Sequence, residues 1–215
     1  KMKILTAPAK KKADKVACIG SGPASLACAA KLAQAGYQVT IFEAAEKAGG
    51  VLTYGITPAR LPQHVVDFDI KTVKDLGVKF VFDTKVGEDI TVDELKKSGF
   101  KAIFIGAGLW DAKIPEIPGK DLKGVTNAID FLKAARDSKG EFDPGKTVVV
   151  IGGGVAGFNA AQMAVGLGAQ VTIFDRSLDR LRHLEGSMQG RLTLLYPTAS
   201  ALDAAAAIAD VVVGA

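Results

Sequence analysis

Two short segments of the sequence have the glycine spacing that can hold a diphosphate. The first is Gly20-Ser-Gly22-Pro-Ala-Ser25 and the second is Gly152-Gly-Gly154-Val-Ala-Gly157. Each follows an apolar run and opens an alanine-rich stretch, which predicts a turn between a strand and a helix. In such a turn the first glycine permits a sharp bend, and the second lets the backbone approach a pyrophosphate that faces the amides of the helix N-terminus. Both segments therefore predict a dinucleotide site.

An acidic residue follows each turn at the same distance. Glu43 and Asp175 each lie 23 residues after the first glycine of their turn and end an apolar run. A carboxylate there accepts hydrogen bonds from the ribose hydroxyls of an adenosine, and it repels a 2′-phosphate. Asp175 thus predicts a preference for NAD, but Arg176 could pair with the 2′-phosphate of NADP, so both nucleotides stay open. The alternative, that both segments are only tight turns of a sheet, would require two coincidental matches.

The third position of each turn needs a small residue, because the helix packs closely against the strand there. Gly157 meets this need in the second turn. Ser25 departs from the usual glycine or alanine in the first turn, although serine is still small.

We expect no catalytic side chain and no metal site. His64 and His183 belong to no catalytic constellation, and lone histidines are more often surface or packing residues. The two cysteines, Cys18 and Cys28, are too few for an iron-sulfur cluster or a structural zinc site. As free thiols in the first strand and helix, they suit a cytoplasmic location.

The elements that must position these residues alternate between strands and helices. Short apolar runs predict strands, and longer stretches that begin with proline or end with glycine predict helices. Glycine and proline recur over residues 49–62, which predicts a long loop. The expected strands are 16–20, 39–43, 78–82, 90–91, 102–105, 147–151, 171–175 and 210–213, the expected helices are 23–35, 65–76, 92–98, 127–136, 159–167 and 201–209, and a turn is expected at 115–119.

This order predicts an α/β fold with two Rossmann-like units, each built on a parallel sheet. The polar stretch 137–146, which contains Asp143-Pro-Gly145, is the expected boundary between them. The predicted domains are therefore 16–140 and 146–215, after a basic tail at 1–15. We expect the second unit to be incomplete.

Composition and charge exclude several classes of protein. The net charge of +4 owes much to six lysines in the first fifteen residues. No aromatic residues alternate with these lysines, so we expect a solvated tail and no nucleic-acid binding. The longest apolar runs fall well short of the roughly 20 residues that a membrane span needs, and the tail lacks the apolar segment of a signal peptide.

From about residue 15 to 146 the sequence resembles the flavin half of the glutamate synthase small subunit and the FAD-binding part of dihydropyrimidine dehydrogenase. The matching motifs are IGSGPAS at 19–25, IFE at 41–43, AGGVLTYGI at 48–56, RLP at 60–62, DLGVKF at 75–80 and FIGAG at 104–108. The resemblance implies that the first unit binds FAD. The residues that would contact it are Gly20, Gly22, Pro23, Ala24, Ser25, Glu43, Gly49, Gly50, Val51, Arg60, Val86 and Gly108. The alternative for Arg60 is a solvent-exposed loop charge.

From about residue 148 the resemblance changes. The run IGGGVAGFNAAQMAVGLGAQVTIFD, with RLRHLE and DVVVGA after it, resembles the NAD-binding domain of alanine dehydrogenase. It implies an NAD(P) site made by Gly152, Gly154, Val155, Ala156, Gly157, Asp175 and Arg176. A join near residue 146 could be natural, engineered or an artefact.

The first resemblance implies an oxidoreductase that passes hydride from NAD(P)H to FAD and electrons onward to a partner. That partner would carry iron-sulfur clusters or the substrate site. No acid, base or nucleophile is required, because the two cofactors carry the chemistry. Two alternatives remain: an NAD-dependent dehydrogenase related to alanine dehydrogenase, and a nucleotide-binding fragment or chimera without turnover.

Overall fold

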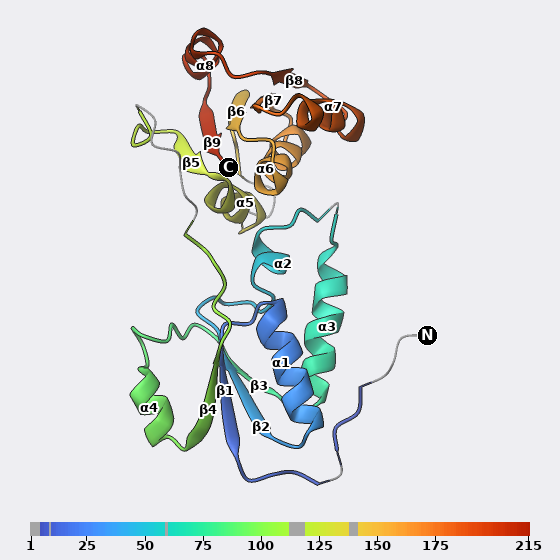
Figure 1. Ribbon diagram of the computed structural model, residues 1–215, viewed down its shortest axis with the longest axis vertical. Coiled ribbons are helices and arrows are strands. Elements are labelled where there is room, and N and C mark those ends of the chain that lie inside the picture. The colour runs from blue at the N-terminus through green and yellow to red at the C-terminus, as the bar shows by residue number, and fades with distance from the viewer. Residues whose placement is uncertain (1–4, 9, 59, 112–118, 138–141) are drawn as a thin grey trace. The chain divides into compact units, whose positions relative to one another are not determined.

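The computed structural model describes the chain except for residues 1–4, 9, 59, 112–118 and 138–141 (Figure 1). The chain divides into two compact units. The first comprises Lys1–Thr53 and Pro58–Leu109, and the second comprises Tyr54–Thr57 and Trp110–Ala215. Each unit has a parallel sheet with helices between its strands, which confirms the expected fold class.

The first unit contains a four-stranded sheet in the order β3-β2-β1-β4. Alternate residues of β1 face opposite sides: Cys18 packs with α1 and α3, and Ala17 packs with Leu95 of α4. Figure 1 shows α1 and α3 together, away from α4. The elements are β1 (Lys15–Ile19), α1 (Pro23–Gln34), β2 (Gln38–Phe42), α2 (Val51–Tyr54), α3 (Gln63–Asp75), β3 (Lys79–Val81), α4 (Val92–Lys97) and β4 (Phe100–Ile105).

Local sequence explains where the helices of this unit begin and end. Proline occupies the first turn of α1, where a missing N–H costs nothing, and Gly36 takes a φ of +93° just beyond its end. Helix α4 begins with a capping box, in which the Thr91 hydroxyl accepts from the Glu94 N–H and the Glu94 carboxylate accepts from the Thr91 N–H. These signals place both helices where the sequence predicts them.

The second unit contains a five-stranded parallel sheet in the order β5-β9-β6-β7-β8. Its core lies between the central strands and the helices α5 and α6, where Phe131, Leu132 and Val150 are almost fully buried. The elements are β5 (Val125–Asn127), α5 (Ala128–Asp137), β6 (Thr147–Ile151), α6 (Val155–Gly166), β7 (Gln170–Phe174), α7 (Leu178–Ser187), β8 (Leu192–Leu195), α8 (Ala199–Ala206) and β9 (Val211–Gly214).

The division between the units differs from the expected boundary at 137–146. Strand β5, which the sequence did not predict, pairs with β9, and α5 packs into the core of the second unit. Both elements precede the polar stretch, so the division in the structure falls earlier than the predicted domain limits 16–140 and 146–215. The turn expected at 115–119 lies mostly outside the described residues.

The loop expected over residues 49–62 contains a short helix, α2. The segment Tyr54–Thr57 belongs to the second unit, where the Arg136 guanidinium donates to the Ile56 carbonyl and Lys133 Nζ lies 5.8 Å from the centre of the Tyr54 ring. The glycine and proline content of this stretch predicted an irregular path but could not reveal these distant partners.

The described part of the basic N-terminal segment is tied to the first unit. The Lys12 N–H donates to the Gly36 carbonyl at 2.7 Å, and the Gln38 N–H donates to the Asp14 carbonyl at 3.1 Å. The Lys12 ammonium lies 4.0 Å from the centre of the Tyr37 ring. Residues 12–14 therefore pack along the turn before β2, whereas a solvated tail was expected.

The two cysteines lie on facing elements, and neither forms a disulfide. Burial, together with the neighbouring Cys28 thiol, raises the pKa of Cys18 to about 12. The native Cys18 thiol therefore stays protonated at pH 8, and only the thiolate alkylates. We expect iodoacetamide to leave Cys18 unmodified in the native chain at pH 8 and to label it fully in denaturant. Peptide mass spectrometry would measure both states, and rapid native labelling of Cys18 would contradict its burial.

Candidate dinucleotide sites

The first turn has the backbone that a diphosphate requires. Gly20 has a φ of +85°, and a Cβ there would lie 2.6 Å from the Gly106 carbonyl oxygen, so only glycine fits. Gly22 is the N-cap of α1, and a Cβ there would meet nothing within 4 Å. The space before the free amides of α1 is therefore open, as an anion at a helix N-terminus needs. Pro23 and Ala24 are exposed at this end of the helix.

The carboxylate expected to hold the ribose lies beside this turn. Glu43 directly follows β2 and is half-buried. Its Oε2 accepts from the Ser21 N–H at 2.8 Å, and its Oε1 accepts from the Ala45 N–H at 2.9 Å. Each carboxylate oxygen can accept two hydrogen bonds, and Oε2 also accepts from the Ser21 hydroxyl, so the remaining capacity for a ribose hydroxyl lies on Oε1.

The loop after β2 returns to the first turn. The Gly49 N–H donates to both the carbonyl and the hydroxyl of Ser21, each at 3.1 Å. Gly49 and Gly50 have φ values of +114° and +55°, and Val51 begins α2 with 40% of its surface exposed. The structure thus brings the predicted residues 49–51 to the predicted turn.

The second turn repeats this geometry. Gly152 has a φ of +101°, and a Cβ there would overlap the Ala215 carbonyl oxygen. Gly154 is the N-cap of α6, and a Cβ there again meets open space. Val155, the first residue of α6, is 71% exposed, and Ala156 is partly buried against the core.

Asp175 occupies the position in the second unit that Glu43 occupies in the first. It directly follows β7, and its Oδ2 accepts from the Gly153 N–H at 2.8 Å. Its Oδ1 accepts from the Ser177 N–H at 2.8 Å. Arg176 is exposed, and the Arg180 Nε donates to the Gly153 carbonyl at 2.5 Å. The second carboxylate is therefore fixed by two backbone amides, as the first is.

The third turn position is packed differently in the two units. Ser25 is fully buried, and a Cβ at Gly106, which follows β4, would overlap its Oγ. In the second unit a Cβ at Gly157 would overlap the Gly152 carbonyl and lie 3.0 Å from the Ala215 Cβ, and Ala215 follows β9. Ser25 is therefore accommodated by Gly106, which follows the adjacent strand. Gly157 instead faces Ala215.

The remaining predicted residues lie in loops. Val86 forms an isolated bridge with Ile90, and the nearby Thr84 N–H donates to the Glu43 carbonyl at 2.9 Å. Gly108 has a φ of +79° and follows Gly106, whose N–H donates to the Ile19 carbonyl at 2.9 Å. Arg60 lies in the turn before α3, and its role in phosphate or flavin binding stays a prediction.

Ser21 and Gly106 belong to the first site, although local sequence did not predict them as site residues. Ser21 was visible as the residue between the two glycines, and Gly106 as the first glycine after the apolar run 102–105. Their partners are separated from them by 22 to 87 residues of chain. Their roles depend on contacts that local spacing does not encode.

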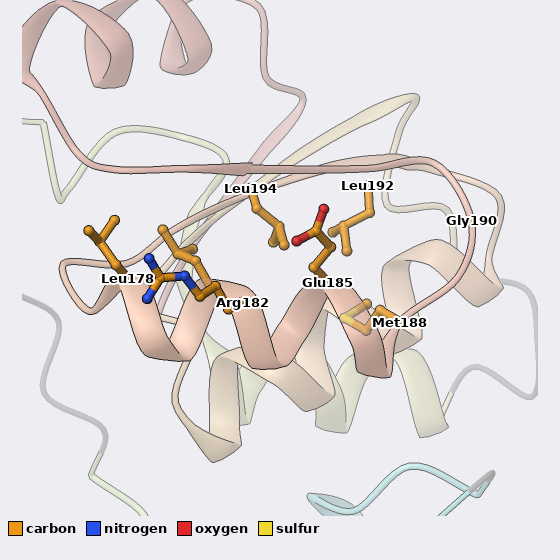
Figure 2. A pocket seen from close by; sticks show the side chains of 8 residues that line it. Leu178, Arg182, Glu185, Met188, Gly190, Leu192 and Leu194 are labelled. Atoms are coloured by element: carbon orange, nitrogen blue, oxygen red, sulfur yellow. The ribbon is translucent and has the colours of Figure 1, made fainter.

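A separate pocket lies between α7 and β8 (Figure 2). It has a volume of about 400 Å³, and Leu192 and Leu194 point from β8 toward Arg182 and Glu185 on α7. None of its lining residues belongs to either glycine turn. Within the described ranges, no group of three or more His, Cys, Asp or Glu side chains could hold a metal ion, and no helix combines the length and apolar character of a bilayer span.

The sequence and fold match known proteins over most of the chain. The profile of the pyridine nucleotide-disulphide oxidoreductase family matches residues 14–193, which include both turns. The glutamate synthase [NADPH] small chain of Bacillus subtilis is 42% identical over 167 residues, covering 74% of this chain and 34% of that protein. The NAD-dependent dihydropyrimidine dehydrogenase subunit PreT of Escherichia coli is 35% identical over 163 residues, covering 76% of this chain and 39% of that protein.

A solved structure shares the fold over nearly the whole chain. The 2-naphthoyl-CoA reductase complex with 2-naphthoyl-CoA has a TM-score of 0.72 and 24% identity, covering 99% of this chain and 34% of that one. This chain spans less than half the length of these relatives. The flavin-half resemblance is thereby confirmed, and the resemblance to alanine dehydrogenase stays a prediction.

Proposed function

Since the chain belongs to the pyridine nucleotide-disulphide oxidoreductase family, we propose that its first unit binds FAD and its second unit binds NAD(P)H. When bound, the two cofactors would supply hydride transfer from the nicotinamide to the flavin, and a partner subunit would receive the electrons. The observation that carries this proposal is the repeated site geometry: two glycine turns at helix N-termini, each with a carboxylate fixed by the amide that follows the first glycine.

The residues of the first unit fit the ADP half of FAD. The amides at the start of α1 and the open space at Gly22 would hold the pyrophosphate, and Glu43 would accept the ribose hydroxyls. When bound, the flavin supplies the redox chemistry, so the chain needs only to bind and orient it. Gly49, Gly50 and Val51, together with Arg60, Val86 and Gly108, would line the remainder of the site.

The second unit fits a pyridine nucleotide in the same way. Gly152, Gly154 and the first turn of α6 would hold its pyrophosphate, and Asp175 would accept its ribose hydroxyls. The names of two relatives specify different nucleotides: the Bacillus subtilis small chain is named for NADPH, and the Escherichia coli subunit is named as NAD-dependent. Their names as a small chain and a subunit support a partner that receives the electrons.

Flavin spectroscopy tests this function. We expect the purified chain, supplied with FAD and separated from the excess, to retain a flavin absorption band that NADH or NADPH bleaches without oxygen. Colourless protein that FAD does not change would contradict the proposal. Alanine-dependent NAD reduction by such protein would instead support the alternative that residues 148–215 belong to a relative of alanine dehydrogenase. Nucleotide binding without either reaction would support a fragment without turnover.

Asp175 is expected to set the nucleotide preference. Asp175→Asn keeps the side-chain size but removes the charge, so NADH affinity should fall about tenfold while NADPH affinity is unchanged or rises. The rate of flavin bleaching against the concentration of each nucleotide would measure both effects. Asp179→Asn, an exposed neighbour that pairs with Arg182 on α7, is the matched control. An equal loss of affinity for NADH and NADPH would show that the Asp175 charge does not discriminate between them.

A further inference from the structure

Ser21 links the two parts of the first site that a flavin nucleotide would touch. The residue is fully buried. Its Oγ donates to Glu43 Oε2 at 2.5 Å and accepts from the Gly49 N–H at 3.1 Å. Its own N–H donates to the same Oε2 at 2.8 Å. One hydroxyl thus connects the predicted ribose-binding carboxylate to the glycine loop after β2.

The connection restricts a flexible side chain. A glutamate has three rotatable side-chain bonds, and ordering them costs conformational entropy. Ser21 holds one carboxylate oxygen with two hydrogen bonds, and the Ala45 N–H holds the other at 2.9 Å. The carboxylate is therefore oriented before any ligand arrives, which reduces the entropy that binding must remove.

The second unit offers an internal comparison. Gly153 occupies the position equivalent to Ser21, and only its N–H reaches the carboxylate of Asp175. A Cβ there would lie 2.8 Å from Leu184 Cδ1, so a serine in the second turn would require the Leu184 side chain to shift. Aspartate has one rotatable bond fewer than glutamate and needs less restraint. The extra hydroxyl thus occurs in the unit whose carboxylate is the longer one.

We propose that Ser21 is a positioning residue of the flavin site, acting through Glu43 on the adenosine ribose and through Gly49 on the adjoining loop. This inference rests on the proposed function of the first unit. It assigns Ser21 no contact with the reacting atoms. Its effect is on affinity for ligands that contain the adenosine ribose.

Isothermal titration of the full chain with FAD, ADP and FMN tests this role. Ser21→Ala should weaken FAD and ADP binding roughly tenfold, the effect of losing a hydrogen bond to a charged group. FMN lacks the adenosine, so any FMN affinity should change little. Ser187→Ala, an exposed serine on α7 whose hydroxyl donates to the His183 carbonyl, is the control and should change none of the three.

A double-mutant cycle separates positioning from general damage. If Ser21 acts through Glu43, then Ser21→Ala should cause little further loss of FAD affinity in a Glu43→Gln background. Equal losses in both backgrounds, or a Ser21→Ala chain that binds FAD as tightly as the wild type, would overturn the inference while leaving the proposed function standing. A wild-type chain that binds no FAD would overturn both. Thermal unfolding without ligand would identify a variant that merely fails to fold.

Discussion

Gly22→Ala is expected to weaken flavin binding about a hundredfold while leaving the fold intact. Gly22 has a φ of −67° and a ψ of 176°, which alanine adopts freely, and its new Cβ would meet no atom within 4 Å. The same methyl group would occupy the space in which a pyrophosphate approaches the amides of α1. Losing two charge-assisted hydrogen bonds would weaken FAD binding by about a hundredfold.

Gly154→Ala is the matched variant in the other unit. Gly154 has a φ of −60° and a ψ of −169°, and it too has open space around a Cβ. This variant should keep the flavin band and lose its bleaching by NAD(P)H, whereas Gly22→Ala should lose the band. Absorption spectra and thermal unfolding of both proteins measure the outcome. A Gly154→Ala chain that loses the flavin band, or a Gly22→Ala chain that keeps it, would contradict the assignment of one nucleotide to each unit.

Gly106→Ala is expected to destabilise the first unit by about 2 kcal/mol, the typical cost of overpacking a close contact. Gly106 follows β4, and its Cβ would overlap Ser25 Oγ and lie 2.9 Å from the Phe104 ring. Ser25 is fully buried, so its hydroxyl cannot turn toward solvent. Urea denaturation followed by circular dichroism would measure the loss as a lower midpoint.

A second substitution tests the cause of that loss. Ser25→Ala removes the overlapping oxygen and leaves the Ser25 Cβ position at 3.4 Å, so it should recover the part of the stability that the Ser25 overlap costs in the Gly106→Ala chain, while the contact with Phe104 remains. Gly166→Ala, at an exposed helical position with nothing within 4 Å of its Cβ, should not destabilise the second unit. A double variant no more stable than Gly106→Ala would show that the strain arises elsewhere.

The sequence predicted the features that neighbouring residues determine. Both glycine turns, the helix α1 and the carboxylates Glu43 and Asp175 lie within short strand-turn-helix-strand segments, and all were located correctly. Helix α6 was predicted at 159–167 but begins four residues earlier, at Val155. The turns are recognisable because glycine at Gly20 and Gly152 is required by the backbone itself. The hydrogen bonds from Ser21 and Gly153 to the carboxylates were not predicted, because they join residues 22 positions apart.

The features that the sequence missed depend on distant partners. Strand β5 has only three residues and exists because it pairs with β9 near the other end of the unit. Without that pairing its sequence has no strand signal, which is why the predicted domain boundary lies later in the chain than the division in the structure. The N-terminal lysines predicted a solvated segment, yet the Lys12 backbone binds Gly36 and its ammonium contacts Tyr37.

The apolar run 102–105 was expected to be a buried strand, and that was only partly correct. Strand β4 lies at the edge of the first sheet. Its residue Ala102 is exposed, and Ile105 has 71% of its surface exposed. Hydrophobic content predicted the strand itself. It could not predict how much of each face the neighbouring elements cover.

The contact between Ser25 and Gly106 also limits the order in which mutations can accumulate. An alanine at 106 is costly while a serine occupies 25, but a smaller residue at 25 removes the overlap with the serine hydroxyl. A lineage moving from this packing toward the glycine and alanine pair of Gly157 and Ala215 would have to change the helix position first. The two positions should therefore covary among relatives, and intermediates with a serine facing an alanine should be rare.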